Sequence, residues 1–208
     1  MKKEKSEDRI IEAALKEFAQ YGFDGARMER IAKRAKLNKA MIYYHFKGKE
    51  ALYEEILTGT FKKVHDLIKD NLPQEKDPVD QLCAMIATYT DFIDSIDLDF
   101  VRLMMRELSS GGTYFRKITL PHFMTPILDM VVDLIEGGMK TGRMRKVNPY
   151  YTYFQIVGSV VFFNALQIML AGTTLHEKMY TENFMKDFQE NMVGIIRNGL
   201  EQQGGKVR

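Results

Sequence analysis

The sequence predicts an all-α protein of about nine helices, with an N-terminal three-helix helix-turn-helix domain followed by a C-terminal helical bundle. Three observations predict this fold class. Apolar residues recur at intervals of three and four along nearly the whole chain, which is the spacing of one helix face. Proline, glycine and capping residues separate these segments at short intervals. The sequence has no segment that alternates convincingly with a period of two, and so no Asn-Gly pair between two such segments that would signal a hairpin.

The composition excludes several classes of protein. The chain has 208 residues, of which 45% are hydrophobic and 28% charged, and this balance argues against intrinsic disorder. Cys83 is the single cysteine, so the chain has neither an internal disulfide framework nor a multi-cysteine metal site. The first nine residues are mostly charged and have no apolar core like that of a secretory signal. We therefore expect a cytoplasmic protein.

The formal net charge of +2 conceals an uneven distribution along the chain. Residues 1–50 contain thirteen Lys or Arg and eight Asp or Glu, which gives +5. Residues 51–100 contain four Lys or Arg and eleven Asp or Glu, which gives −7. Between Met28 and Lys49 seven basic residues stand against Glu29 alone. A basic cluster beside an acidic segment suits a small anion-binding domain, although a charge run alone also suits a solvated helix.

The first helices follow from local signals. A helix is expected from Ser6, whose hydroxyl can cap it, to Gly22, which can adopt the left-handed conformation that ends a helix. A short helix from Met28 to Ala35 carries its apolar residues on one face. After a three-residue turn, Asn38 can cap a third helix from Lys39 to about His45. These signals predict two short helices packed on a longer one.

The later helices are separated mainly by prolines and glycines. The segment 115–139 contains Pro121 and Pro126, so we expect a short helix, a kink and a longer helix there. Residues 154–171 form the most apolar run, which at eighteen residues barely reaches a membrane span and is expected to be a buried packing helix. The expected helices are 48–71, 79–96, 98–108, 115–139 in two parts, 149–171 and 182–202.

Two short helices joined by a tight turn form the unit that places a helix in the DNA major groove. In the second short helix, Ile42 and Phe46 are expected to point inward, and the exposed side chains are Lys39, Ala40, Tyr43 and Tyr44. Lys39 is long enough to reach a guanine edge, and Ala40 or Met41 can contact a thymine methyl group. Lys47 and Lys49 are placed to approach the phosphates. The alternative is an ordinary helical hairpin with a basic face.

The stretch Gly22–Leu52, GFDGARMERIAKRAKLNKAMIYYHFKGKEAL, resembles the DNA-binding domain of the tetracycline-repressor (TetR) family. The resemblance covers about residues 6–55, and chain length and the segment 138–145 before Pro149 also fit. It implies that Tyr43 and Lys49 hold phosphates, that residues 38–44 face the operator and that Phe46 anchors the recognition helix. The candidate DNA-binding residues are Arg27, Asn38, Lys39, Ala40, Met41, Tyr43, Tyr44, His45, Lys47 and Lys49.

Three residues depart from the family pattern. Arg27 stands where the family usually has a Ser or Thr that caps the second helix and touches phosphate. Arginine cannot cap, so the contact could persist only through its charge. Lys36 replaces the usual turn glycine, which predicts a less strained turn or a left-handed lysine. Asn38 replaces the common serine and keeps the capping function.

The sequence contains none of the common catalytic signatures. It has no Gly-x-Ser-x-Gly elbow, phosphate loop or dinucleotide fingerprint. Its four histidines are scattered, and no two have the spacing of metal ligands beside a carboxylate. His45 belongs to the family motif and is expected to pack or to approach a phosphate. We therefore expect no enzyme activity, no cofactor and no metal.

We expect residues 1–50 to bind DNA and residues 51–208 to bind a ligand and dimerise. A single recognition helix buries little surface, so such proteins pair and place two recognition helices about one DNA turn apart, ~34–36 Å. The last two long helices could form a four-helix bundle with a second copy, as the resemblance also implies, or could be intramolecular core. The candidate interface residues are Phe163, Phe184, Phe188, Met192, Ile195 and Ile196.

The middle helices are rich in methionine and phenylalanine, which suits an adaptable apolar cavity. The candidate ligand-binding residues are Met85, Tyr89, Phe92, Met104, Phe123, Ile127, Phe154 and Phe162, each of which could instead be core. The polar residues on these helices could orient a ligand or satisfy core hydrogen bonds: His122, Gln155, Asn164 and Gln167.

Taken together, these features predict a homodimeric, ligand-responsive transcriptional regulator. We expect a repressor that binds a palindromic operator in double-stranded DNA and is released by a small, largely apolar effector. The helix from about Gly48 to Asn71 joins the two parts and is the expected lever. The alternative is a helical ligand-binding or enzyme-like bundle that carries a basic N-terminal hairpin.

Overall fold

The computed structural model describes residues 2–73 and 77–202. These residues form ten α-helices and one π-helix, and their contacts divide the chain into two compact units. Unit 1 comprises residues 1–63 and 96–123, and unit 2 comprises residues 64–95 and 124–208. Within the described ranges the one strand-like pairing is an isolated bridge between Met144 and Glu201. The all-α prediction is confirmed.

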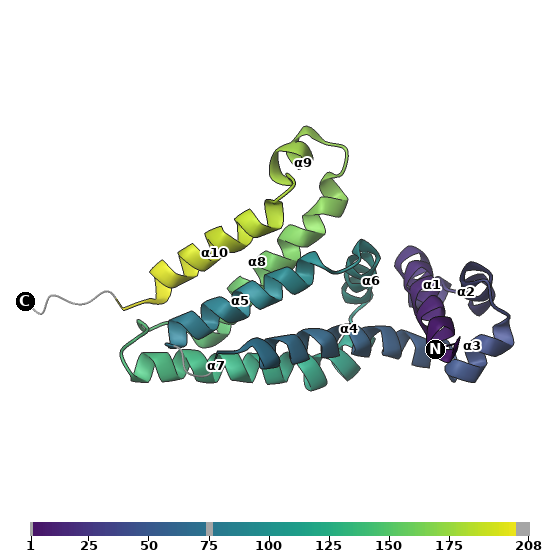
Figure 1. Ribbon diagram of the computed structural model, residues 1–208, viewed down its shortest axis with the longest axis horizontal. Helices are drawn as coiled ribbons and strands as arrows, with labels where there is room; N and C mark the ends of the chain where they lie inside the picture. The colour runs from purple at the N-terminus through teal and green to yellow at the C-terminus, as the bar shows by residue number, and fades with distance from the viewer. Residues whose placement is uncertain (1, 74–76, 203–208) are drawn as a thin grey trace, which may run out of the picture. The chain divides into compact units, whose positions relative to one another are not determined.

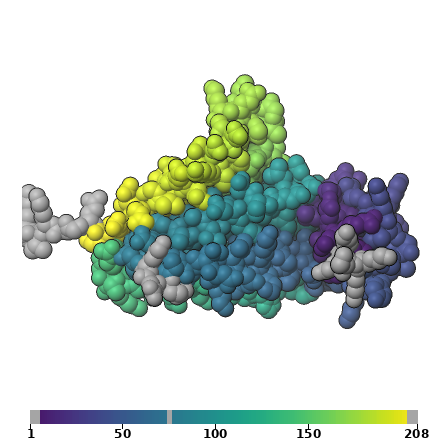
Figure 2. All heavy atoms as spheres, in the orientation of Figure 1, coloured from purple at the N-terminus to yellow at the C-terminus, as the bar shows by residue number. Residues whose placement is uncertain are grey.

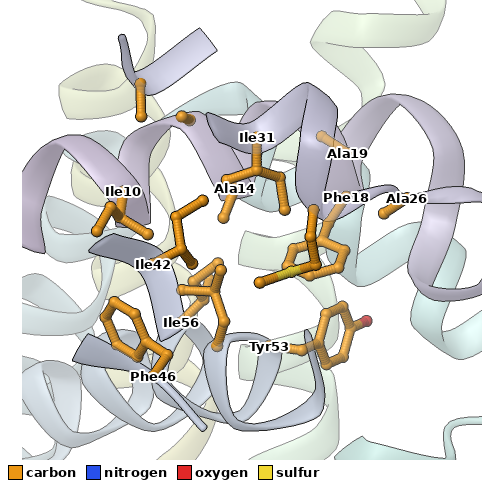
Figure 3. Packing of buried hydrophobic residues seen from close by; sticks show 14 of the residues in the cluster. Ile10, Ala14, Phe18, Ala19, Ala26, Ile31, Ile42, Phe46, Tyr53 and Ile56 are labelled. Carbon is orange, nitrogen blue, oxygen red and sulfur yellow. The ribbon is translucent and has the colours of Figure 1, made fainter. Parts of the chain in front are cut away.

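Unit 1 packs the N-terminal helices around one hydrophobic core (Figures 1 and 3). Ile10 and Phe18 project from the first helix toward Ile42 and Tyr53, and the side chains of all four residues are at most 2% exposed. Burying such large apolar side chains stabilises a fold by roughly 1.5–3 kcal/mol each. The elements are α1 (Lys2–Gly25), α2 (Met28–Ala35), α3 (Lys39–His45), the first part of α4 (Lys49–Asn71), α6 (Leu98–Ser109) and η1 (Phe115–Met124).

Local chemistry explains the boundaries of the short helices. Gly22 has φ 71° and interrupts α1 where the sequence predicted its end, so the last turn to Gly25 is a separate piece. Lys36 has φ 55° and is the left-handed residue that ends α2. It is the one described non-glycine residue with positive φ, a conformation that costs an L-residue roughly 1–2 kcal/mol. The Asn38 side chain accepts the N–H of Met41 at 2.8 Å and caps α3, as expected.

The compact unit that contains α1 to α3 extends beyond residue 50. The Arg106 Nε on α6 donates to the carbonyl oxygen of Ala19 on α1 at 2.7 Å. Phe100 and Leu103, also on α6, belong to the same buried cluster as the residues of α1. The predicted division of roles at residue 50 stays a prediction, because the compact units describe packing and not function.

Unit 2 is a bundle in which α10 lies along α5 (Figures 1 and 2). Polar side chains tie the two helices together at two points. Arg197 on α10 pairs with Asp80 at 2.6 Å, and Gln189 donates to the Ala87 carbonyl at 3.0 Å. The elements are α5 (Pro78–Asp94), α7 (Thr125–Lys140), α8 (Pro149–Leu170), α9 (Thr174–Met179), α10 (Phe184–Leu200) and the last part of α4.

Two elements differ from the sequence prediction. The segment before Pro126 is a ten-residue π-helix, η1, which contains Pro121; α7 starts at Thr125 and has Pro126 in its first turn. The short helix α9 was not predicted, because its six residues show no apolar periodicity; the hydroxyl of Thr173 caps it by accepting the His176 N–H at 3.2 Å.

Two described segments are long and apolar enough to cross a membrane by length and composition, 115–140 and 149–170. Core helices of soluble proteins pass the same test, so this finding is weak evidence of a membrane span. Only 28% of the apolar window of α8 is buried by the rest of the chain. A single chain therefore covers the expected packing helix only in part, and one face of α8 is open.

Candidate nucleic-acid interface

The exposed face of α3 carries the side chains that the sequence predicted. Tyr43 is 48% exposed and Tyr44 is 70% exposed, and Lys39 and Ala40 are also exposed. On the opposite side Ile42 is fully buried in the core (Figure 3). Burial of this face holds α3 rigidly against the rest of unit 1. The predicted orientation of the helix is confirmed.

Lys39 is paired with an acid from the neighbouring helix. Its ammonium bonds to the Glu29 carboxylate of α2 and lies 5.7 Å from the centre of the Tyr43 ring. The hydrogen bond with Lys39 lowers the pKa of Glu29, and the same bond raises the pKa of Lys39. Both side chains are largely exposed, so the pair is weak and Lys39 can leave it for another acceptor.

Lys47 and Lys49 flank the start of α4 but differ in their surroundings. Lys47 is exposed. The Lys49 ammonium lies 3.3 Å from the Ala26 carbonyl and 4.6 Å from the centre of the Phe23 ring. Lys49 therefore links the start of α4 to the segment between α1 and α2, and its ammonium lies beside that segment.

Burial separates His45 from the exposed residues of α3 with which we grouped it. The His45 side chain is 1% exposed, and its Nε2 lies 2.9 Å from the Ser6 hydroxyl of α1. The ring therefore packs α3 against α1, which is the first of the two roles expected for it. Met41 is half-buried, whereas Asn38 acts as the cap of α3.

The structure shows that Glu17 holds the start of α2, a role that the sequence analysis missed. Arg27 occupies the N-cap position, is exposed and makes no side-chain cap. The fully buried Glu17 of α1 instead accepts the Arg27 N–H at 3.1 Å and bonds to the Arg30 guanidinium at 2.5 Å. The only sequence signal was a charged residue on the apolar face of α1, beside Phe18.

A second buried carboxylate, also missed, joins α4, α6 and η1. Glu107 is 4% exposed and accepts the Tyr53 hydroxyl at 2.9 Å. It also accepts the backbone N–H groups of Tyr114 and Phe115, at 2.7 and 3.0 Å, and so caps the start of η1. Burial, and then the bond to Glu107, raise the pKa of Tyr53, so the phenol stays protonated and remains a donor. This network fixes α4 to α6 inside unit 1.

The predicted ligand-binding residues fall into three groups. Met85, Phe92 and Ile127 are buried in unit 2, and Tyr89 is largely shielded there; Met104 and Phe123 are half-buried in unit 1. Phe154 is 56% exposed and Phe162 is 61% exposed, so their placement does not suit walls of an interior cavity. A hollow of about 290 Å³ in unit 1, between α1, α4 and α6, contains none of the eight predicted residues.

The interior of unit 2 contains polar groups among apolar side chains. Asn164 of α8 is 3% exposed; its amide nitrogen lies 3.4 Å from the Ile93 carbonyl, and its Oδ1 has no hydrogen-bond partner among the described residues. Burial raises the pKa of Tyr153 to about 12 and also raises that of Tyr89. The sequence left the roles of four polar residues undecided. Among these four, Asn164 is the one with a buried atom that has no hydrogen-bond partner among the described residues.

Several predicted interface residues pack within the chain. Phe163 of α8 stacks on Phe188 of α10 with ring centres 4.2 Å apart, and the ring centre of Phe184 lies 6.1 Å from that of Phe163. The most exposed apolar side chains of α8 are Tyr151, Phe154, Phe162 and Met169, and their spacing places them on one face of the helix; Tyr150 and Val161 are also exposed. On α10, Ile195 is 62% exposed, whereas Met192 and Ile196 are half-buried.

Comparison with known proteins agrees with this arrangement. The family described as "Bacterial regulatory proteins, tetR family" matches residues 10–56, and "Tetracyclin repressor-like, C-terminal domain" matches residues 78–196. The chain is 27% identical to the HTH-type transcriptional regulator RutR of Escherichia coli K12, over 90% of this chain and 89% of RutR. It is 30% identical to the uncharacterised regulator YhgD of Bacillus subtilis, over 70% of this chain and 75% of YhgD.

Solved structures share the fold at low sequence identity. FadR of Bacillus halodurans, a fatty acid degradation regulator, has a TM-score of 0.72 at 18% identity and covers 95% of this chain and 97% of its own. FadR of Bacillus subtilis, solved with stearoyl-CoA, has a TM-score of 0.70 at 16% identity. The match covers 92% of this chain and 97% of that FadR chain. These relatives are regulators and not enzymes. The chain belongs to the TetR family of bacterial DNA-binding transcriptional regulators.

Proposed function

We propose that the protein is a homodimeric repressor that binds a palindromic operator and is released by an apolar effector. The observation that carries the proposal is the face of α3, which exposes Lys39, Tyr43 and Tyr44 while Ile42 holds the helix in the core. A rigid helix with an exposed basic and hydroxyl-bearing face suits the major groove. A cytoplasmic location is part of the same proposal.

The open face of α8 supports the homodimer. Tyr151, Phe154, Phe162 and Met169 form an apolar surface that the chain does not cover. Gly158 lies on the same face, and a Cβ added there would meet no atom within 4 Å. An exposed glycine inside a helix costs roughly 0.5–1 kcal/mol relative to alanine, and close approach of a second helix explains its presence. We therefore place the dimer contact on this face, with Ile195 of α10 as a further candidate.

The interior of unit 2 supports a largely apolar effector that carries a polar group. Met85, Phe92 and Ile127 offer flexible and aromatic apolar contacts, and the unpaired Oδ1 of Asn164 can accept a hydrogen bond from a polar group. Since a fold neighbour was solved with stearoyl-CoA, a long acyl chain is the effector class to test first. We expect stearoyl-CoA or stearate to raise the melting temperature, and coenzyme A alone to leave it unchanged.

Selection of double-stranded DNA from a random pool, followed by fluorescence anisotropy on the selected sequence, tests the function directly. We expect a two-fold symmetric site, bound by two chains, whose affinity falls steeply with salt because phosphate contacts release counterions. The acyl ligand should weaken binding. Enrichment of no sequence, together with equal weak binding to all DNA, would contradict the proposal and favour the helical bundle with a basic hairpin.

A further inference from the structure

The start of α2 is capped in an unusual way. In the common capping box, a Glu or Gln at the third helical position accepts the N–H of the N-cap residue. Here the third position of α2 is Arg30, and the N-cap is Arg27, which has an extended backbone and no side-chain cap. The carboxylate that accepts the Arg27 N–H comes from Glu17, ten residues earlier on α1. A neighbouring helix thus supplies the cap that α2 lacks.

Glu17 is held firmly in this position. Its side chain is fully buried, and one oxygen bonds to both the Arg27 N–H and the Arg30 Nε. Arg30 is fixed in turn, since it donates to the Gly25 carbonyl at 2.6 Å and its guanidinium lies 4.2 Å from the centre of the Tyr21 ring. The cluster therefore sets how the first turn of α2 sits on α1.

This arrangement leaves the Arg27 side chain with no capping role, and its charge acts through space on the Glu29 carboxylate, where it helps to lower the pKa. The guanidinium is exposed and makes no hydrogen bond or ion pair with any residue that the structure describes. It lies at the N-terminus of α2, where the helix dipole favours an anion. An arginine at that position has five donors and a permanent charge, whereas a capping Ser or Thr offers one hydroxyl that is already engaged by the backbone.

We infer that Glu17 is a positioning residue for DNA binding, which caps α2 in place of the residue at position 27 and thereby leaves Arg27 free to bind a DNA phosphate. The inference rests on the proposed function. On this inference, the arginine that departs from the family pattern at position 27 contacts the phosphate through its guanidinium. Glu17, held by Arg30, compensates for the side-chain cap that position 27 no longer provides.

Arg27→Ala, at an exposed position, tests the phosphate contact without disturbing the core. On the operator selected with the wild-type protein, each phosphate contact adds about 0.9 to the salt slope of the affinity. We expect the variant to reduce the slope by about 0.9 per subunit and to lower affinity for all sequences alike. An unchanged slope, with wild-type protein binding normally, overturns the inference. If the wild-type protein selects no operator, the proposed function fails instead.

Glu17→Gln tests the positioning role, and Glu12→Gln on the exposed side of α1 is the matched control. We expect the control to change nothing and Glu17→Gln to weaken operator binding about tenfold at a temperature where circular dichroism shows it folded. The double variant Glu17→Gln/Arg27→Ser should regain the melting temperature that Glu17→Gln loses, because serine restores an ordinary cap. Its salt slope should stay as low as that of Arg27→Ala, because the guanidinium is absent. A lower melting temperature with full operator affinity would show that Glu17 serves the fold alone.

Discussion

The exposed face of α3 and the exposed face of α8 are alike in one respect and opposite in another. Both lie on helices whose other faces are buried, and the chain covers neither. The α3 face carries Lys39, Tyr43 and Tyr44, whereas the α8 face carries Tyr151, Phe154, Phe162 and Met169. A basic, hydroxyl-bearing face suits a polyanion, and an apolar face suits an equally apolar partner. The difference indicates DNA for one surface and a second copy for the other.

The largest expected effect comes from a charge on the apolar face. Phe162→Glu should abolish the dimer at micromolar concentration, because two-fold symmetry brings the new carboxylate into the interface twice. Loss of a buried aromatic anchor costs about 2–4 kcal/mol, and burial of the charge adds to this. Sedimentation velocity measures the result. Leu175→Glu on α9, which is also exposed and apolar, is the control, and a dimer that survives Phe162→Glu would place the interface elsewhere.

The next effect concerns the buried scaffold of unit 1. Glu107→Ala removes the acceptor of three buried or partly buried donors, the Tyr53 hydroxyl and the N–H groups of Tyr114 and Phe115. We expect the free energy of unfolding to fall by about 3 kcal/mol. Urea titration followed by circular dichroism measures it, and Glu136→Ala, at a solvent-exposed ion pair, should cost at most about 0.5 kcal/mol. Equal losses in both variants would mean that the Glu107 network adds no stability.

A smaller effect separates base contacts from phosphate contacts on α3. Lys39→Ala should change which bases are preferred at one position of each half-site, by about 1–3 kcal/mol. Tyr43→Phe should instead weaken all operator variants by about the same factor, because a lost phosphate contact carries no sequence information. Anisotropy titrations on a panel of single-base operator variants distinguish these patterns. A uniform loss for Lys39→Ala would remove it from the base-reading role.

The smallest effect is a pH dependence. The Lys39 bond lowers the pKa of Glu29 in the folded protein, so the pair stabilises the fold fully above the unfolded value of 4.5. That stabilisation is lost as the pH falls through the lower folded value. Glu29→Gln should therefore melt slightly below wild type at pH 7, and the two melting temperatures should converge as the pH falls below 4.5. A difference that is constant across this range would show that Glu29 acts by another route.

The short helices of unit 1 were predictable because their signals are local. The apolar face of Met28–Ala35, the turn at Lys36 and the Asn38 cap each depend on residues within a few positions. The exposed residues of α3 follow from the same periodicity, since burial of Ile42 fixes the orientation of the helix. The family resemblance added the expected partner, DNA.

Two glutamates were not predictable because their partners are distant in sequence or hidden in the backbone. Glu107 bonds to Tyr53, 54 positions away, and Glu17 accepts the backbone N–H of Arg27, a pairing that only the fold reveals. A buried acid and an exposed acid look alike in a single sequence. Burial alone turns such a residue into a fixed acceptor, because an unpaired carboxylate in the core is costly.

The sequence by itself determined the helical class, the helix-turn-helix boundaries and the chemistry of the α3 face, since each follows from local periodicity and capping. Only the tertiary structure decided which side of α8 is open, because a helix that is apolar all round has no preferred face until its neighbours are placed. It placed Phe154 and Phe162 on an exposed surface, and it stacked Phe163 on Phe188 within the chain. The contacts of α8 with its neighbours within unit 2, and not its composition, made that choice.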